Sequence, residues 1–470
     1  MLSRAVQRGT LQRVARGIYA RDTAADPAEI VRRHIWRILA HELPGAVIAD
    51  RSVCTGGMPA GGALYVVHSR RRPLDLPGLT IFPRAGTGAV HGDMQLPDGL
   101  WMSSTARALL DNLVTGRGAE RRLTREEIEE WIERLLQQRG EDGLNALRDN
   151  ARSIAAELGR EVQLRELDTL ISAALTTQSS VELVSPALRA RAAGVPCDEK
   201  RLEAFANLIA RLQELPPDVV PNLSAMVIRR QLLPFYEAYF SNFIEGTEFT
   251  VDEAAEIVFD GKMPEGRPQD AHDVLCTYEL VRDPIELATV PRTGDGLLEL
   301  LQQRHAVLLG SRPDKRPGEF KTRANRAGLT EFVAPDLVKG TLRRGFEIGQ
   351  ELVGPFERAV YMMFLIAEVH PFNDGNGRIA RIMMNAELVA AGEVRIIIPI
   401  VYRGNYLSAL RGATHNGNYR ALIRMLSFAR KYTARIDFTD RVTAEADLER
   451  THAFLDAQQA EADGIRLSLP

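Results

Sequence analysis

The clearest hydrophobic pattern runs through residues 359–369, where apolar side chains occur at almost every position. A helix that is apolar on all sides is buried on all sides, so this run predicts a helix at the centre of a domain. His370 should end that helix, because Pro371 disfavours the helical conformation in the residue before it. The composition of residues 378–391 predicts a second helix, which Gly392 stops. The pattern therefore predicts a helix–loop–helix corner with glycines in the loop.

The first part of the chain has a different pattern, in which short β-type runs are separated by glycine and proline. These runs predict strands at residues 46–49, 63–67 and 79–82. Helices are expected before and after them, at residues 3–16, 27–43 and 105–113, the last with a cap at residues 102–105. Residues 1–115 are therefore predicted to form a small α/β domain.

The rest of the chain is predicted to be mainly helical. Thr124 and Glu127 form a capping box that opens a helical, charged region reaching to about residue 215. The prolines within residues 215–221 predict a linker. Beyond it the expected elements are helices at residues 225–245 and 270–287, a helix capped by Thr250 and Glu253, a β-hairpin within residues 310–327 and a charged helix at residues 443–462.

This pattern gives four predicted regions. They are an α/β domain at residues 1–115, a helical connector at 116–215, a helical domain at 223–437 and a C-terminal helical tail at 438–470. The tail is either a solvated end or a surface for a partner. The fold class is therefore mainly α, preceded by a small α/β domain.

Length and composition narrow the class of protein. A chain of 470 residues is long enough for two to four domains. A net charge of −3 argues against a surface that binds nucleic acid everywhere, although a local basic patch stays open. The three cysteines, Cys54, Cys197 and Cys276, lie far apart and form no metal or disulfide pattern. With no signal peptide and no apolar run of membrane-spanning length, a cytoplasmic protein without membrane contact is expected.

The residues suited to chemistry gather in the corner between the two central helices. Gly375 and Gly377 let backbone N–H groups turn inward, and the second helix adds its own free N–H groups, so the corner can bind an anion. Arg378 and Arg381 suit phosphate, and Asp374 is an oxygen ligand of the type that Mg²⁺ takes beside phosphates. The histidine that ends the first helix can accept a proton near neutral pH.

Each of these features has a simpler interpretation by itself. A lone histidine at the end of an apolar helix is more often structural than catalytic, and Asp-Gly-Asn-Gly is usually only a turn. A calcium loop is a further reading, but Arg378 would then occupy the fifth position, where an oxygen ligand is required. Taken together, residues 370–381 predict transfer of a phosphate-containing group to an incoming hydroxyl.

Residues 370–381 read His-Pro-Phe-Asn-Asp-Gly-Asn-Gly-Arg-Ile-Ala-Arg. This resembles the signature of the Fic family, His-x-Phe-x-Asp/Glu-Gly-Asn-Gly-Arg-x-x-Arg, at every fixed position. The resemblance implies a Fic helical bundle with a β-hairpin flap over residues 223–437. It implies transfer of AMP from ATP to a Ser, Thr or Tyr hydroxyl of a target protein or of this chain itself. Whether the chain forms a homodimer is left open. His370 would be the base and Asp374 would hold Mg²⁺, and the implied nucleotide-binding residues are Asn373, Gly375, Asn376, Gly377, Arg378, Arg381 and Tyr406.

A second short segment, residues 241–246, reads Ser-Asn-Phe-Ile-Glu-Gly. Helical spacing puts Ser241 and Glu245 on one face, and Gly246 is a suitable left-handed stop, so a plain helix end explains it too. The segment resembles the inhibitory Ser/Thr-x-x-x-Glu-Gly/Asn motif of the Fic family. That resemblance implies that Glu245 pairs with Arg381 in cis and blocks the position of the ATP γ-phosphate. The same glutamate could instead position a water that removes AMP, so deAMPylation stays an alternative.

Two further predictions rest on the same resemblance. Residues 310–327 correspond to the flap that pairs with the target backbone, with Glu319, Phe320 and Lys321 as candidate flap residues. The usual aromatic-Ile-Gly end of the flap reads Arg-Ala-Gly here, so this part of the target-binding segment departs from the family's pattern. Tyr406 either borders the adenine pocket or belongs to the core.

The first 115 residues resemble AbiEi-type antitoxins more diffusely. The basic N-terminal segment ends in Arg-Gly-Ile-Tyr at residues 16–19, and the winged helix of those antitoxins has a similar end. Ser104, Arg107 and Asp111 match the Ser-x-x-Arg-Ala-Leu-x-Asp order of the same family. A complete helix-turn-helix needs further helices ahead of its recognition helix, so this segment is expected to be only the end of such a unit. The resemblance implies a winged-helix remnant. As a rival function, it implies a nucleotide-sensing regulator that binds DNA or a toxin partner through residues 1–115.

Overall fold

The computed structural model describes residues 2–116, 118–177, 181–216, 220 and 230–470. Its internal contacts divide the chain into two units, Met1–Gly194 and Val195–Pro470. The boundary falls inside the region predicted as a helical connector. The first unit is mixed α/β and the second is helical with one small hairpin, so the predicted fold class is confirmed.

The first unit contains a mixed six-stranded sheet of order β5-β6-β4-β3-β8-β7. Strands β4 and β6 pair in parallel, as do β3 and β8, and the other pairs are antiparallel. The strands of this unit are β1 (Gln12–Ala15), β2 (Ile18–Ala20), β3 (Val47–Ile48), β4 (Ala63–Val67), β5 (Leu74–Leu76), β6 (Leu79–Arg84), β7 (Met94–Gln95) and β8 (Trp101–Met102). The three predicted strands are therefore confirmed as β3, β4 and β6.

The two larger hydrophobic clusters of the first unit join its helices to one another and to the sheet. One joins the helix α2 to the sheet, and the other joins α3, α4 and α5. The helices are α1 (Leu2–Gln7), α2 (Pro27–Glu42), α3 (Thr105–Asn112), α4 (Arg125–Leu158), α5 (Glu161–Ala174) and α6 (Pro186–Ala192). The predicted caps at Ser104 and Thr124 are confirmed, and α4 is broken at Gly140.

The helix predicted over residues 3–16 is wrong beyond Gln7. The structure has the short helix α1 followed by an antiparallel hairpin of β1 and β2. Gly9 and Gly17 both have positive φ angles, of 70° and 83°. Glycine adopts this conformation freely but costs helix stability, which favours a turn at each position. The hairpin has the place of the wing in the winged-helix interpretation.

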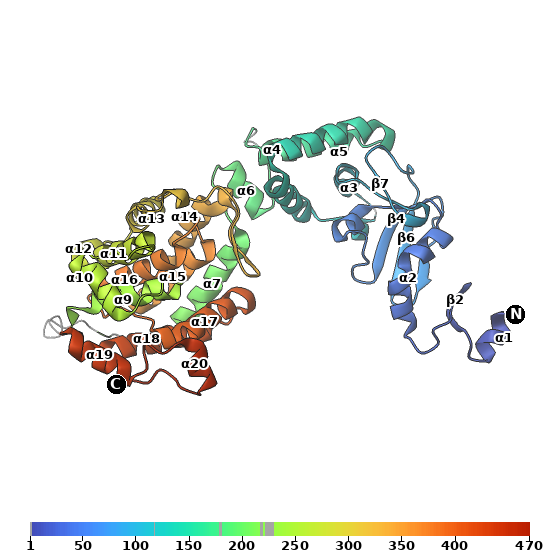
Figure 1. The fold of residues 1–470 in the computed structure, drawn as a ribbon. Helices are drawn as coiled ribbons and strands as arrows, with labels where there is room; N and C mark the ends of the chain where they lie inside the picture. The colour runs from blue at the N-terminus through green and yellow to red at the C-terminus, as the bar shows by residue number, and fades with distance from the viewer. Residues whose placement is uncertain (1, 117, 178–180, 217–219, 221–229) are drawn as a thin grey trace. The chain divides into compact units, whose positions relative to one another are not determined.

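The second unit is a helical bundle built around α15 and α16, which lie at its centre (Figure 1). Its helices are α7 (Glu199–Gln213), α9 (Leu233–Ile244), α10 (Val251–Asp260), α11 (Pro268–Arg282), α12 (Pro284–Leu287), α13 (Gly294–Leu308), α14 (Val338–Gly349), α15 (Pro355–Val369), α16 (Asn376–Ala390), α17 (Arg403–Asn416), α18 (Tyr419–Arg435), α19 (Arg441–Arg450) and α20 (Ala457–Ala462). The predicted corner is formed by α15, the loop after it and α16.

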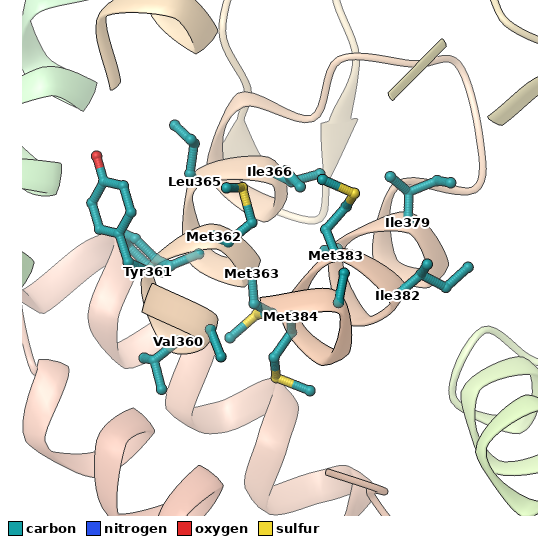
Figure 2. Packing of buried hydrophobic residues seen from close by; sticks show 14 of the residues in the cluster. Val360, Tyr361, Met362, Met363, Leu365, Ile366, Ile379, Ile382, Met383 and Met384 are labelled. Atoms are coloured by element: carbon teal, nitrogen blue, oxygen red, sulfur yellow. The ribbon is translucent and has the colours of Figure 1, made fainter. Parts of the chain in front are cut away.

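Helices α15 and α16 pack along their length through apolar side chains. Figure 2 shows Met363 and Ile366 of α15 beside Met383 and Met384 of α16. These four side chains are fully buried. Burial removes each of them from water at a gain of roughly 1.5–3 kcal/mol per side chain. The corner that carries the candidate chemistry is therefore attached to the buried core of the unit.

Three predicted elements of this unit end differently in the structure. The helix predicted at residues 225–245 begins at Leu233, and residues 225–229 lie outside the described part of the chain. Pro284 divides the helix predicted at 270–287 into α11 and α12, because proline cannot continue the hydrogen-bond ladder. The hairpin expected within residues 310–327 forms instead from β9 (Arg326–Ala327) and β10 (Thr330–Glu331), so Glu319, Phe320 and Lys321 are not in a strand.

The end of the chain is not a free tail. The charged helix predicted at residues 443–462 is two helices, α19 and α20, separated by a turn. Ala444, Leu448 and Ala460 are buried in a cluster with aromatic residues of α9. No helix among the described residues is both long and apolar enough to span a bilayer. The expected cytoplasmic location stays a prediction.

Candidate active site

His370 ends α15 in the left-handed conformation, with φ 51° and ψ 59°. Its Nδ1 lies 3.3 Å from the carbonyl oxygen of Ala367, so Nδ1 carries the proton that this contact needs and Nε2 keeps a lone pair. The imidazole stacks on the ring of Phe332, with centroids 3.7 Å apart. Burial lowers the pKa of His370 to about 4. The side chain is therefore a neutral base at neutral pH.

The loop after His370 is closed by Asn376. Its Oδ1 accepts from the backbone N–H of Phe372 at 2.8 Å, and its Nδ2 donates to the carbonyl oxygen of Phe372 at 2.9 Å. Gly375 precedes α16 with φ +72°, a conformation that favours glycine. Asn376 is buried and its amide shapes the loop, while the first backbone N–H groups of α16 have no partner within the helix.

Asp374 is the one carboxylate within residues 370–377, and its side chain is 40% exposed. Its Oδ1 accepts the Gly375 N–H at 2.7 Å, and its Oδ2 lies 3.9 Å from the Nζ of Lys315. Among the described residues there is no group of three or more His, Cys, Asp or Glu side chains that could hold a metal by themselves. One accessible carboxylate fits Mg²⁺, which keeps waters and takes its other ligands from substrate phosphates.

His305 supports this loop from α13, and sequence reasoning missed it. Its Nδ1 accepts the Gly318 N–H at 2.9 Å, so its Nε2 carries the proton and donates to the carbonyl oxygen of Asp374 at 3.1 Å. Its ring stacks on Phe372 at 3.7 Å. Burial lowers the pKa of His305 to about 4. A single histidine in a leucine-rich helix carries no signal that would have identified it.

Arg378 is buried and ion-paired. Its NH1 lies 2.7 Å from Asp273 Oδ2 on α11 and 3.3 Å from Asn242 Oδ1 on α9. Arg312 pairs with the same aspartate at 2.8 Å. In the structure, the predicted phosphate ligand therefore also joins α16 to two other helices. Asp273 was not identified from the sequence, because its partners lie far away along the chain.

Arg381 brings the two short segments together. Its NH2 donates to Glu245 Oε1 at 2.7 Å and to the Ser241 carbonyl oxygen at 2.8 Å, and its Nε donates to Ser241 Oγ at 3.0 Å. Arg381 is buried, and the Glu245 side chain is 31% exposed. Gly246, with φ +90°, turns the chain away after α9. The Ser241 and Glu245 face of α9 thus meets the second arginine of the 370–381 segment.

Glu245 lies directly against the first turn of α16. A Cβ atom placed on Gly377 would be only 2.2 Å from Glu245 Oε1, so the carboxylate uses the space that glycine leaves. The N-terminus of a helix attracts anions through its free N–H groups and its dipole. Arg381 adds a positive charge at the same place. The carboxylate therefore occupies a site built for an anion.

The remaining predicted residues lie around this centre in different environments. Tyr406 is 1% exposed and belongs to the core, with its ring 5.9 Å from the Arg381 guanidinium. Asn373 is exposed at the rim. Glu319 is exposed and pairs with Arg316. Phe320 packs 5.2 Å from Phe372, and Lys321 is buried beneath the loop, 2% exposed.

Residues 297–388 match the Fic/DOC family model. The chain is 27% identical over 238 residues to "Protein adenylyltransferase Fic" of Drosophila persimilis, covering 49% of this chain and 45% of the relative. It is 24% identical over 198 residues to "Protein adenylyltransferase fic-1" of Caenorhabditis elegans, covering 41% and 39%. A solved Fic-domain-containing signaling protein from Bacteroides thetaiotaomicron aligns at 21% identity over 51% of this chain and 98% of that one, with a TM-score of 0.38. The chain spans less than half the length of these two curated relatives.

Proposed function

Since the chain is a Fic-family protein, we propose that it transfers AMP from ATP to a hydroxyl group of a target protein. The observation that carries the proposal is the corner itself. A neutral imidazole with a free Nε2 ends α15, and an anion site begins α16 six residues later. The names of the curated relatives support the same activity.

In the proposed reaction the target hydroxyl oxygen attacks the α-phosphorus of ATP. A new P–O bond forms to the target, the bond between the α-phosphorus and the bridging oxygen breaks, and pyrophosphate leaves. His370 Nε2 accepts the hydroxyl proton, which a base with a lowered pKa can do at neutral pH. The N-terminus of α16 and Arg381 bind the phosphates.

Asp374 would hold Mg²⁺ at the edge of this site. Its carboxylate is accessible and keeps capacity beyond its contact with the Gly375 N–H. A bound Mg²⁺ would neutralise charge on the phosphates of ATP. The buried pair of Arg378 and Asp273 keeps the first turn of α16 in place beside it.

We also propose that Glu245 inhibits the enzyme in cis. Its carboxylate fills the anion site and pairs with Arg381, so a phosphate group would have to displace it. The carboxylate both excludes the phosphate by volume and neutralises the guanidinium that would bind it. Replacement by glycine removes both effects and leaves the rest of the site intact.

Mass spectrometry of the Glu245→Gly variant, incubated with ATP, Mg²⁺ and cell lysate, tests the proposed function. AMP adducts on serine, threonine or tyrosine of lysate proteins or of the variant itself are expected. The matched control is Glu245→Gly with His370→Ala, which removes the base and should lower transfer by roughly 10²–10⁴-fold. Equal adduct levels in the two proteins, or none in either, would refute the proposal.

One observation favours the reverse reaction as a second candidate. Only Oε1 of Glu245 is bonded to Arg381, and the side chain is partly exposed. The other carboxylate oxygen could orient a water towards an AMP–protein bond. Incubating the wild-type protein with an AMP-modified substrate distinguishes the two activities. Release of AMP that Glu245→Gly abolishes would support deAMPylation, and no release would exclude it.

The first unit suggests a separate regulatory role. Residues 1–21 contain five arginines and no acidic residue, and in the described part of the chain none of the five forms an ion pair. Such a segment suits phosphate groups of DNA or an acidic toxin partner. A gel-shift assay with the full chain, compared with a variant in which Arg13 and Arg16 are alanine, tests the DNA version. Equal weak binding by both proteins would count against it.

A further inference from the structure

His370 has a backbone conformation that side chains with a Cβ rarely adopt, with φ 51°. Such a conformation persists only where neighbouring groups hold it. The neighbours belong to a segment that we call the brace, residues 321–325, which follows α13 and precedes the hairpin of β9 and β10. The brace was expected to contact the target protein, but it lies under the catalytic loop.

The brace donates hydrogen bonds to four consecutive carbonyl oxygens of the catalytic loop. The Lys321 Nζ donates to Val369 at 3.2 Å, and the Lys321 backbone N–H donates to Pro371 at 2.8 Å. The Asn325 Nδ2 donates to Phe372 at 2.9 Å and approaches the His370 carbonyl oxygen at 3.4 Å. Lys321 and Asn325 are themselves joined, with Nζ 2.6 Å from Oδ1.

Lys321 also places a charge beside the base. Its Nζ lies 5.9 Å from the ring of Phe332, which stacks on His370. Burial is the largest cause of the lowered pKa of His370, and the Lys321 ammonium lowers that pKa further. The backbone contact to Ala367 and the carboxylates of Glu245 and Asp374 raise it. Burial, with Arg201 nearby, lowers the pKa of Lys321 to about 7. Lys321 is therefore cationic in the acidic range in which His370, with its pKa of about 4, takes up a proton.

We propose that Lys321 and Asn325 are positioning residues for the reaction, which fix the left-handed His370 and keep its imidazole in the neutral, proton-accepting form. This inference rests on the proposed AMP transfer. Lys321 would act through His370 and not through the target protein. Its removal should therefore change turnover and the pH profile more than the apparent affinity for ATP.

The test uses the full chain in the Glu245→Gly background, with AMP transfer measured against pH. Lys321→Met is expected to lower kcat about 10- to 100-fold, because a base displaced by about 1 Å loses rate on that order. The KM for ATP should stay within about twofold. The acidic limb of the profile should move to higher pH, and Lys321→Arg should restore part of the rate. The matched control is Lys339→Met, an exposed lysine of α14 that should behave like the background protein.

An unchanged kcat and an unchanged acidic limb in Lys321→Met would overturn the inference. If that variant does not fold, Asn325→Ala provides the same test, because it removes the donor to His370 and Phe372 and keeps the lysine. If the Glu245→Gly protein itself transfers no AMP, the proposed function fails, but the inference is still tested by NMR titration of His370. A His370 pKa that is equal in wild type and Lys321→Met would refute it there.

Discussion

His370 and His305 are both neutral through burial, but their hydrogen bonds give them different roles. His305 uses both ring nitrogens, one accepting from Gly318 and one donating to Asp374. His370 uses only Nδ1, towards the Ala367 carbonyl oxygen. A ring with both nitrogens engaged can only support structure, whereas a ring with a free lone pair can take a proton from substrate.

NMR titration of the histidine side chains tests this distinction. The pKa of each residue is lowered to about 4, so the neutral form should persist from neutral pH down to about pH 5, and protonation should begin only below that. His370 should carry its proton on Nδ1 and His305 on Nε2. His370→Gln and His305→Gln assign the signals. A His370 that titrates near 6.5, the ordinary histidine value, or carries its proton on Nε2 would contradict the account.

The sequence predicted single residues well where a local motif carried them. The pairing of Glu245 with Arg381 was expected from two short segments, and the two side chains are in contact. Asp273 and Lys321 lie 105 and 49 residues before their partners Arg378 and His370, so no local pattern could show their roles. Buried partners of this kind are set by helix packing, which a single sequence does not display.

At the level of elements, the C-terminal end of α9 meets the N-terminal end of α16. Helix ends were predicted well where their caps are local, as at Thr124 and Thr250, which form capping boxes in the structure. The hairpin was displaced because residues 310–325 lack an alternating pattern, and Gly328, with φ +58°, supplies the turn further on. Contacts with α7 and α17 also hold it, since Arg201 donates to the Glu331 carbonyl and Thr330 bonds to His415.

The contact between α9 and α16 predicts that Gly377→Ala has opposite effects in two backgrounds. In the wild type the new methyl group would meet Glu245 Oε1, and overpacking of this kind costs about 1–3 kcal/mol. In Glu245→Gly that clash is gone, and alanine should raise helix stability by up to about 1 kcal/mol. Urea unfolding of the four proteins measures this coupling.

Gly404→Ala is the matched control, because a Cβ there has ordinary contact only with Ala457. It should change the free energy of unfolding equally in both backgrounds. An equal effect of Gly377→Ala in the two backgrounds would mean that Glu245 does not occupy the first turn of α16.

At the level of the whole molecule, the candidate base, the anion site and Glu245 all belong to the second unit. The helices α9, α15 and α16 that carry them all contribute side chains to one hydrophobic cluster of that unit. The proposed inhibition by Glu245 therefore needs no partner subunit. The ratio of the Glu245→Gly rate to the wild-type rate should therefore be the same at every protein concentration.

The rate of AMP incorporation into the protein itself, measured with α-labelled ATP and Mg²⁺, tests this account most directly. We compare wild type, Glu245→Gly and Glu245→Gly with His370→Ala. The account predicts that Glu245→Gly incorporates AMP at least tenfold faster than wild type, and that loss of His370 abolishes the gain. Equal rates for wild type and Glu245→Gly, with His370 intact, would contradict it.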